Sequence, residues 1–226
     1  MLPRHNLVWL SDDGWQAVLE QAPHDAVPSI QAWACARHPA VVRRTEPDAN
    51  DGTVCAGIAL PPDASGTKKR IPLRIPSAHV SRISAPLRLD EVVAAMPSTW
   101  RPALAFLCAE ARRQNIGFRV YGSAALQEIT GMRYITHSSD IDLLLQPATH
   151  AELHAGLLLM AGHARALPLD GEVIFPDGSA VAWKEWMTAI AASGHPRVLA
   201  KDNRRVRLVK TEDLLCTLED EPCTSH

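Results

Sequence analysis

The sequence has no excess of either charge. Its 226 residues contain 23 Lys and Arg against 25 Asp and Glu, which gives a formal net charge of −2. A protein that binds nucleic acid through bulk electrostatics is strongly basic, and an acidic interaction tail shows the reverse. The composition therefore excludes nucleic acid as a partner selected by overall charge.

Long hydrophobic runs and regularly spaced cysteines are also missing. The most apolar stretch, residues 157–161, is far shorter than the roughly 20 residues of a membrane-spanning helix. Charged residues interrupt the N-terminal segment MLPRHNLVWLSDDGW before a signal-peptide core develops. The five cysteines form no C-x-x-C pair, so neither a disulfide framework nor a zinc ribbon is expected. We expect a cytoplasmic protein with reduced thiols and no membrane partner.

The pattern of helical and strand-like segments changes at Pro86. Before this proline, two helical segments precede three strand-like runs that are bounded by turn residues. These segments are residues 12–22, 29–37, 40–44, 54–60 and 71–75. Residues 1–86 are therefore predicted to form a small α+β N-terminal domain.

Helices and strands alternate more regularly over residues 87–226. The expected helices are 98–114, 122–131, 149–162 and 183–191, and the expected strands are 118–122, 138–147, 167–175 and 205–210. Interleaved elements of this kind pack around one sheet. The prediction is an α+β protein whose second, larger domain holds a mixed sheet with flanking helices.

Residues with phosphate and metal chemistry lie close together in VYGSAALQEITGMRYITHSSDIDLLL. Gly122 and Ser123 end a strand and open a helix, where unpaired backbone N–H groups hold phosphate oxygens. Asp140 and Asp142 begin the next strand, and the two-residue period puts both carboxylates on one face. Such hard oxygen ligands favour Mg²⁺, and a pair of ions would orient a triphosphate.

A third carboxylate is expected from LPLDGEVIF, whose Asp170 and Glu172 share a strand face. Either residue could complete the site, and Asp170 is preferred. An Asp-Gly turn within a hairpin is the alternative structural interpretation of Asp170.

The order of these motifs resembles that of the polymerase-β-like nucleotidyltransferases. A glycine-serine turn after a strand, a helix, D-x-D at the start of a strand and an acid on a later strand all match that pattern. The gap between Ser123 and Asp140 is longer than in many members, which implies an extended loop at residues 131–138. The resemblance implies a nucleotidyltransferase-like mixed sheet.

A closer resemblance covers nearly the whole chain. The segments RHNLVWL, GTKKRI, YGSAALQEITGMRYITHSSDIDLLL and DGEVIFPDGSAVAWKEW are similar to those of the malonate decarboxylase holo-acyl-carrier-protein synthases, also called phosphoribosyl-dephospho-CoA transferases. This resemblance implies transfer of triphosphoribosyl-dephospho-CoA to a serine of the apo carrier subunit of malonate decarboxylase. A phosphodiester would form, and diphosphate would leave.

The resemblance also implies roles for individual residues. Asp140, Asp142 and Asp170 would bind two Mg²⁺ ions, and Asp170 could instead help to deprotonate the incoming serine. Gly122 and Ser123 would hold the outgoing diphosphate. Lys69 and Arg70 could clamp substrate phosphates from the N-terminal half, or simply form a solvated loop. Lys184 could likewise reach a phosphate, or remain merely exposed.

Three questions stay open at this point. The chain could be another nucleotidyltransferase of the same fold that uses ATP, or a binding module that has lost turnover. The third carboxylate could be Glu172. A basic run near the end could meet an acidic carrier protein or solubilise an edge strand; its members are Lys201, Arg204, Arg205 and Arg207.

Overall fold

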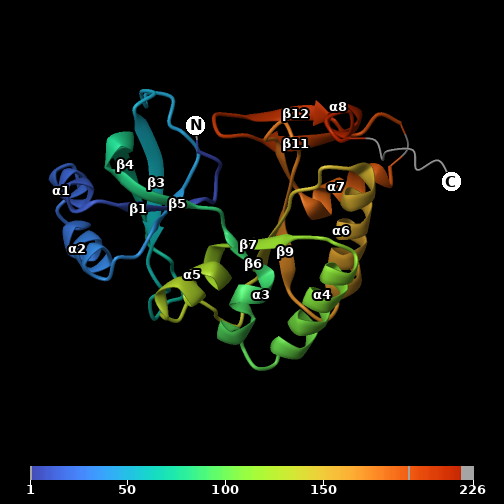
Figure 1. Cartoon of the computed structure of the whole chain (residues 1–226), viewed down its shortest axis with the longest axis horizontal. Coiled ribbons are helices and arrows are strands. Elements are labelled where there is room, and N and C mark those ends of the chain that lie inside the picture. Colours follow the sequence, from blue (N-terminus) through green and yellow to red (C-terminus); the bar gives the residue numbers. More distant parts are fainter. Residues whose placement is uncertain (1, 193, 220–226) are drawn as a thin grey trace. The chain divides into compact units, whose positions relative to one another are not determined.

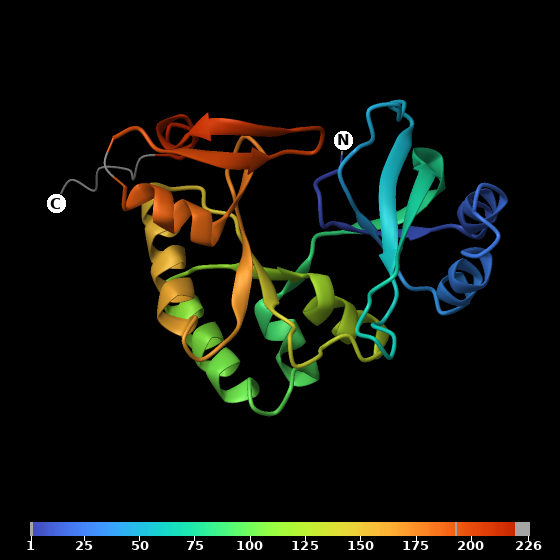
Figure 2. The same ribbon diagram turned by 180° about the vertical axis from the view of Figure 1, so that it is seen from behind.

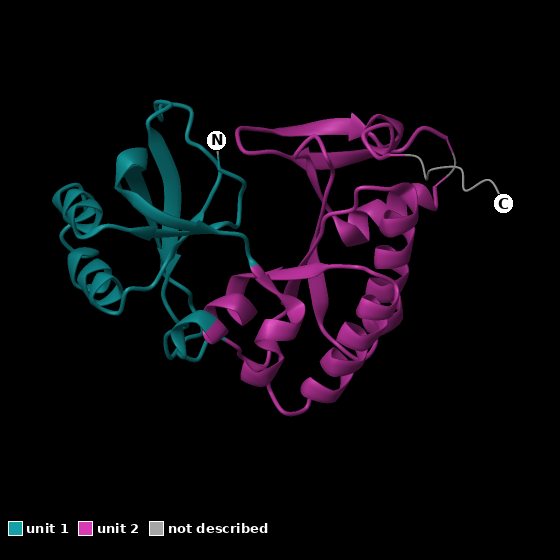
Figure 3. Cartoon of the chain, in the orientation of Figure 1, with its two compact units in different colours: residues 1–86, 129–134 teal, residues 87–128, 135–226 magenta. Residues whose placement is uncertain are grey.

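The computed structural model describes residues 2–192 and 194–219. The chain divides into two compact units, coloured separately in Figure 3. Unit 1 comprises residues 1–86 with 129–134, and unit 2 comprises residues 87–128 with 135–226. A segment from the middle of the sequence thus belongs to the N-terminal unit.

Unit 1 is an antiparallel sheet of five strands in the order β4-β3-β2-β1-β5. Two helices, α1 and α2, cover one face of it (Figure 1). On β4 the side chains alternate between buried and exposed, so only one face is covered. The elements are β1 (Leu7–Leu10), α1 (Asp12–Glu20), α2 (Val27–Cys35), β2 (Ala40–Val42), β3 (Thr53–Ala59), β4 (Arg70–Pro76), a 3₁₀ turn (Ser77–His79) and β5 (Val80–Ser84).

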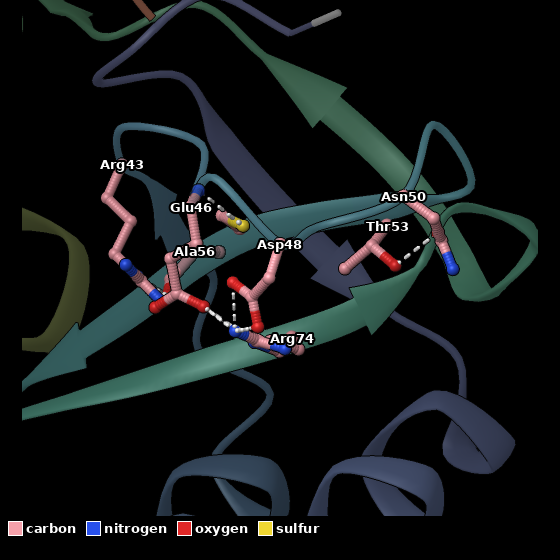
Figure 4. A network of polar contacts seen from close by, with 8 residues as sticks. Arg43, Glu46, Asp48, Asn50, Thr53, Ala56 and Arg74 are labelled. Atoms are coloured by element: carbon pink, nitrogen blue, oxygen red, sulfur yellow. Dashed lines mark hydrogen bonds and ion pairs between the residues drawn. The ribbon is translucent and has the colours of Figure 1, made fainter. Parts of the chain in front are cut away.

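Two arginines and two carboxylates tie the β2–β3 connection to β4. The Nε of Arg74 donates to Glu46 at 2.6 Å, and its terminal nitrogen donates to both oxygens of Asp48 at 2.7 Å (Figure 4). Arg43 donates to the other oxygen of Glu46 at 2.5 Å. The bonds from Arg43 and then Arg74 lower the pKa of Glu46, and Arg74 lowers the pKa of Asp48. Both carboxylates therefore stay ionised to lower pH than free carboxyl groups.

The segment that rejoins unit 1, residues 129–134, is anchored by Tyr134. This side chain is fully buried, and its hydroxyl donates to the carbonyl oxygen of Ala59 at 2.6 Å. Burial raises the pKa of Tyr134 to about 12. The phenol therefore remains protonated, and remains a donor, at neutral pH.

Unit 2 holds a seven-stranded mixed sheet in the order β12-β11-β10-β9-β8-β7-β6. Strands β8 and β9 pair in parallel, and the other neighbouring strands pair antiparallel. The strands are β6 (Leu87–Arg88), β7 (Phe118–Tyr121), β8 (Ile141–Leu145), β9 (Leu169–Ile174), β10 (Ala180–Ala182), β11 (Arg197–Lys201) and β12 (Val206–Lys210). The result is the α+β architecture with flanking helices that the sequence predicts.

The parallel pair requires a crossover, and helix α6 provides it. A Cβ atom built on Gly156 of α6 would lie 2.5 Å from the methyl groups of Leu145, so α6 packs against the Leu145 face of β8. Asp142 points to the opposite face by the strand alternation. The helices of unit 2 are α3 (Leu89–Val92), a 3₁₀ turn (Val93–Ala95), α4 (Arg101–Arg113), α5 (Gly122–Thr130), α6 (His150–His163), α7 (Trp183–Ile190) and α8 (Thr211–Leu215). The last two residues of α5 belong to unit 1.

Most predicted helices and strands are confirmed to within a few residues, and several short strands are additional. Strands β1, β5, β6, β10 and β11 were not expected; β6 and β10 have only two and three residues. None of the described helices is long and apolar enough to cross a membrane. Cys35, Cys55, Cys108 and Cys216 are free thiols, and Cys223 lies outside the described residues.

Candidate functional site

The candidate site is built where β7, α5, β8 and β9 meet. Asp142, the second residue of β8, lies opposite Tyr121 of the antiparallel strand β7. On its other side it is in register with Asp170 of the parallel strand β9. Neighbouring strands lie about 4.8 Å apart, so the two carboxylates stand side by side on one face of the sheet.

Gly122 allows the chain to turn from β7 into α5 directly against Asp142. Its φ of +67° lies in the left-handed region, which a residue with a Cβ atom rarely adopts. A Cβ atom at this position would lie 2.2 Å from Oδ2 of Asp142. Glycine is therefore required twice over, by the backbone conformation and by the close approach of the carboxylate.

Helix α5 begins at Gly122, so its N-terminus lies beside the Asp142 carboxylate. The first N–H groups of a helix have no partner within the helix, and the helix dipole favours negative charge at this end. Ser123 occupies the second position of α5. The start of α5 is thus suited to bind an anionic oxygen of a substrate.

The two candidate third acids, Asp170 and Glu172, have different surroundings. The Asp170 side chain is 43% exposed, and one of its oxygens lies 3.4 Å from Nζ of Lys184 at the start of α7. The Glu172 side chain is only 8% exposed and accepts a hydrogen bond from Nζ of Lys201 at 3.2 Å. Asp170 is therefore open to a substrate, whereas Glu172 is enclosed and paired.

Asp170 lies within a strand and not in a hairpin turn. Gly171 follows it with a φ of +135°, and a Cβ atom there would lie 1.9 Å from the carbonyl oxygen of Leu143. The missing side chain lets β9 approach β8 closely at this point. Gly171 therefore serves the parallel pairing that sets Asp170 beside Asp142.

Within residues 2–192 and 194–219, no three or more His, Cys, Asp or Glu side chains are arranged so that they could hold a metal ion. Asp140 precedes β8 and is exposed. The oxygen donors of Asp142 and Asp170 nevertheless fit Mg²⁺, which proteins usually bind through one or two carboxylates together with substrate phosphates and water.

Lys69 and Arg70 belong to unit 1, whereas the carboxylates belong to unit 2. Nζ of Lys69 forms an exposed ion pair with Asp25 at 2.8 Å, and the hydrogen bond from Lys69 lowers the pKa of Asp25. Arg70 is the first residue of β4, with an exposed side chain.

The sequence did not predict the pairing of Lys201 with Glu172. The alternation of RVLAK gives a signal for strand β11, but the pairing also requires that β10 lie between β9 and β11. Lys184 was identified from the sequence, although its contact with Asp170 was not.

Two family models match this chain, one over its N-terminal part and one over its C-terminal part. The family model described as the phosphoribosyl-dephospho-CoA transferase MdcG N-terminal domain matches residues 3–86, and that of the C-terminal domain matches residues 87–212. No solved structure matches the chain.

Curated relatives extend this likeness over almost the full length. A phosphoribosyl-dephospho-CoA transferase of Xanthomonas campestris pv. campestris is 38% identical over 211 residues, which cover 92% of this chain and 94% of the relative. The protein of the same name from Bradyrhizobium diazoefficiens is 35% identical over 209 residues, 91% of this chain and 89% of the relative. The chain therefore belongs to the phosphoribosyl-dephospho-CoA transferase family, and it is a transferase enzyme.

Proposed function

We propose that the enzyme transfers the phosphoribosyl-dephospho-CoA group of 2'-(5''-triphosphoribosyl)-3'-dephospho-CoA to a serine of the apo acyl-carrier-protein subunit of malonate decarboxylase. The serine oxygen attacks the phosphorus nearest the ribose. The bond breaks between this phosphorus and the oxygen that links it to the second phosphorus, and diphosphate leaves with that oxygen. The serine proton passes to a base, and a phosphodiester remains on the carrier.

The observation that carries this proposal is the register of Asp142 with Asp170 beside the start of α5. Two adjacent carboxylates and a helix N-terminus provide ligands for a divalent cation and donors for phosphate oxygens within one site. Transfer of a phosphoryl group needs little beyond such positioning and charge stabilisation. The family assignment supplies the substrate class.

Each residue of the site has a distinct task in this proposal. Asp140, Asp142 and Asp170 would hold Mg²⁺. Bound Mg²⁺ would neutralise phosphoryl charge and lower the pKa of the attacking hydroxyl. The backbone N–H groups at Gly122 and Ser123 would donate hydrogen bonds to the oxygens of the outgoing diphosphate.

The preferred third carboxylate is Asp170. It is in register with Asp142 and half exposed, whereas Glu172 is buried against Lys201. Asp170 would either bind the second Mg²⁺ or take the serine proton. Lys184, which lies beside Asp170, would neutralise a substrate phosphate once Asp170 binds a cation.

Outside unit 2, Lys69 and Arg70 are proposed to bind phosphates of the precursor. Lys69 would exchange its exposed pairing with Asp25 for a phosphate, because an exposed ion pair contributes only about 0–1 kcal/mol. A cytoplasmic location is proposed as well, where free thiols remain reduced.

The test is an intact-mass measurement on the carrier. Purified enzyme, Mg²⁺, the triphosphoribosyl precursor and apo carrier are expected to give a mass gain on the carrier that maps to one serine, with release of diphosphate. Omission of Mg²⁺ should abolish the gain. Absence of the gain, together with transfer from ATP to another acceptor, would identify a different nucleotidyltransferase of this fold.

A further inference from the structure

The outward face of the β11–β12 hairpin combines leucines with cations. In register, Arg197 lies opposite Lys210, and Leu199 lies opposite Leu208. Residues two apart on a strand share a face, so these four side chains form one patch, which we call the hairpin face. The intervening residue Val198 is buried on the opposite face.

The leucines of the hairpin face are unusually open to solvent. Leu199 is 42% exposed and Leu208 is 59% exposed. Val206, two residues before Leu208 and on the same face, is 40% exposed. These three residues are among seven large hydrophobic side chains that are exposed in the described parts of the chain. Charged edge strands prevent aggregation, but adjacent exposed leucines do not serve that purpose.

The two cations that flank the leucines have no counter-ion among the described residues. Neither Arg197 nor Lys210 has a hydrogen-bonding or ion-pair partner for its side chain within residues 2–192 and 194–219. Like charges directly opposite each other across an antiparallel pair are destabilising. Glu212, which follows closely in the chain, is bound to His195 instead. An anionic group placed over Arg197 and Lys210 would remove this repulsion.

The basic run identified from the sequence is arranged differently. Lys201 binds the buried Glu172, and Arg207 donates to Ser179 at 2.9 Å. Both cations therefore already have partners in the fold. On the hairpin face, Arg197 and Lys210 are cations without such partners among the described residues.

The hairpin face lies on the same face of the unit 2 sheet as the candidate site. Lys201 is in register with Ala180 of β10, and its ammonium group reaches Glu172 of β9. Glu172 is in register with Leu144 of β8, two residues after Asp142. Alternation along β8 keeps Leu144 and Asp142 on one face.

The hairpin lies at one end of the sheet, with its turn directed away from α7 and α8 (Figures 1 and 2). Helix α6 lies over the other face, against Leu145. A macromolecule seated on the hairpin face would therefore be on the side of the sheet that carries Asp142.

We propose that the hairpin face docks the protein acceptor of the transfer reaction, through an acidic surface that covers Arg197 and Lys210 and an apolar side chain that covers Leu199 and Leu208. The proposal rests on the proposed function, since it assumes a protein acceptor. The leucine pair favours a protein over a nucleic acid, which is bound chiefly through its phosphates. Charge complementarity with the unpartnered cations specifies an acidic partner.

The test compares Leu208→Glu and Lys210→Glu with the wild-type enzyme. Both substitutions should raise the KM for apo carrier and its calorimetric Kd about tenfold or more, whereas the KM for the triphosphoribosyl precursor should stay within about twofold. Loss of one buried contact or charge at an interface accounts for a change of this size. Calorimetry measures the affinity for apo carrier in the absence of turnover, so it distinguishes a loss of carrier binding from a loss of catalytic rate.

Matched controls exist on other surfaces of unit 2. Leu158→Glu changes a leucine of similar exposure on α6, at 56% against 59% for Leu208. Arg165→Glu changes an exposed cation after α6. Both controls should leave the Kd for carrier unchanged. Thermal unfolding of each variant checks that the fold is retained.

The outcomes separate the two proposals. A wild-type enzyme that modifies no carrier defeats the proposed function itself. Transfer by the wild type together with unchanged carrier affinity in Leu208→Glu and Lys210→Glu overturns the docking surface alone. A wild-type dimer in sedimentation that Leu208→Glu converts to monomer would assign the face to a second copy of the chain, which also overturns it.

Discussion

Asp142 and Asp170 are register partners in the parallel strand pair β8–β9. Their carboxylates come from distant parts of the sequence, and the crossover through α6 brings the two strands together. Gly122 and Gly171 both permit this arrangement, because a Cβ atom at either position would overlap Asp142 or β8. The site thus depends on two carboxylate side chains and on two glycines, whose lack of a Cβ atom leaves room for the close contacts.

Replacement of Asp142 by Asn should abolish most of the transfer activity. The amide keeps the shape of the side chain but removes the charge that would bind Mg²⁺, so a loss of kcat on the order of 10²–10³-fold is expected. Asp213→Asn, which changes an exposed acid on α8, serves as the control. Initial rates of carrier modification, with circular dichroism to verify the fold, provide the measurement. Retained transfer activity in Asp142→Asn would place the catalytic site elsewhere.

Gly122→Ala should reduce both transfer activity and stability, whereas Gly131→Ala should reduce stability alone. Both glycines have left-handed φ values, +67° and +69°, so each substitution should cost about 1–2 kcal/mol in the free energy of unfolding. Only at Gly122 would the added Cβ atom meet Asp142, because nothing lies within 4 Å of that position at Gly131.

Denaturant unfolding and transfer kinetics of the two variants separate these effects. We expect similar stability losses in both, with at least a tenfold larger fall in kcat for Gly122→Ala. Equal kcat values in the two alanine variants would show that the Gly122 contact with Asp142 has no part in catalysis.

Lys184→Met should weaken binding of the precursor without unfolding the enzyme. Its ion pair with Asp170 is largely exposed, at 57% and 43%, so its loss should change stability by less than about 1 kcal/mol. The ammonium group would face the substrate phosphates, and its removal should raise the KM for the precursor about five- to tenfold. Thr188→Met on the exposed side of α7 is the control. A KM equal to that of wild type would remove Lys184 from the phosphate site.

The arginine cluster of unit 1 predicts how stability depends on pH. Arg43 and Arg74 lower the pKa of Glu46, and Arg74 lowers that of Asp48. Groups with a depressed folded pKa stabilise the fold at pH values above their unfolded pKa, and this contribution is lost as the pH falls through the folded pKa.

The difference in Tm between wild type and Arg74→Met should therefore be largest near pH 6–7 and should shrink below about pH 4, where the carboxyl groups become protonated. Thermal unfolding from pH 3 to 7, followed by circular dichroism, measures it. Arg165→Met, at an exposed arginine, should show no such trend. A constant difference across this range would mean that Arg74 stabilises unit 1 through packing.

The sequence predicts the long elements well because their periodicity and termini are explicit. Thr149 caps α6 by accepting from the backbone N–H of Glu152, as expected for a helix that begins there. Strand β5 was missed for a physical reason. It shows little burial, so the alternation that identifies a strand is absent from its sequence.

The carboxylates of the candidate site can be proposed from the sequence, but their arrangement cannot. Strand order decides which residues become neighbours, and no local pattern encodes that β8 pairs with β9 or that β10 separates β9 from β11. The choice between Asp170 and Glu172 illustrates this limit, because both share a strand face in the sequence. Their difference arises from Lys184 and Lys201, which arrive from later elements.

Single-turnover transfer by Asp170→Asn and Glu172→Gln, measured side by side with saturating enzyme, Mg²⁺ and precursor, tests the central claim most directly. The predicted result is a loss on the order of 10²-fold or more for Asp170→Asn and a rate within about threefold of wild type for folded Glu172→Gln. A normal rate in Asp170→Asn together with a large loss in Glu172→Gln would contradict the pairing of Asp142 with Asp170 as the catalytic site.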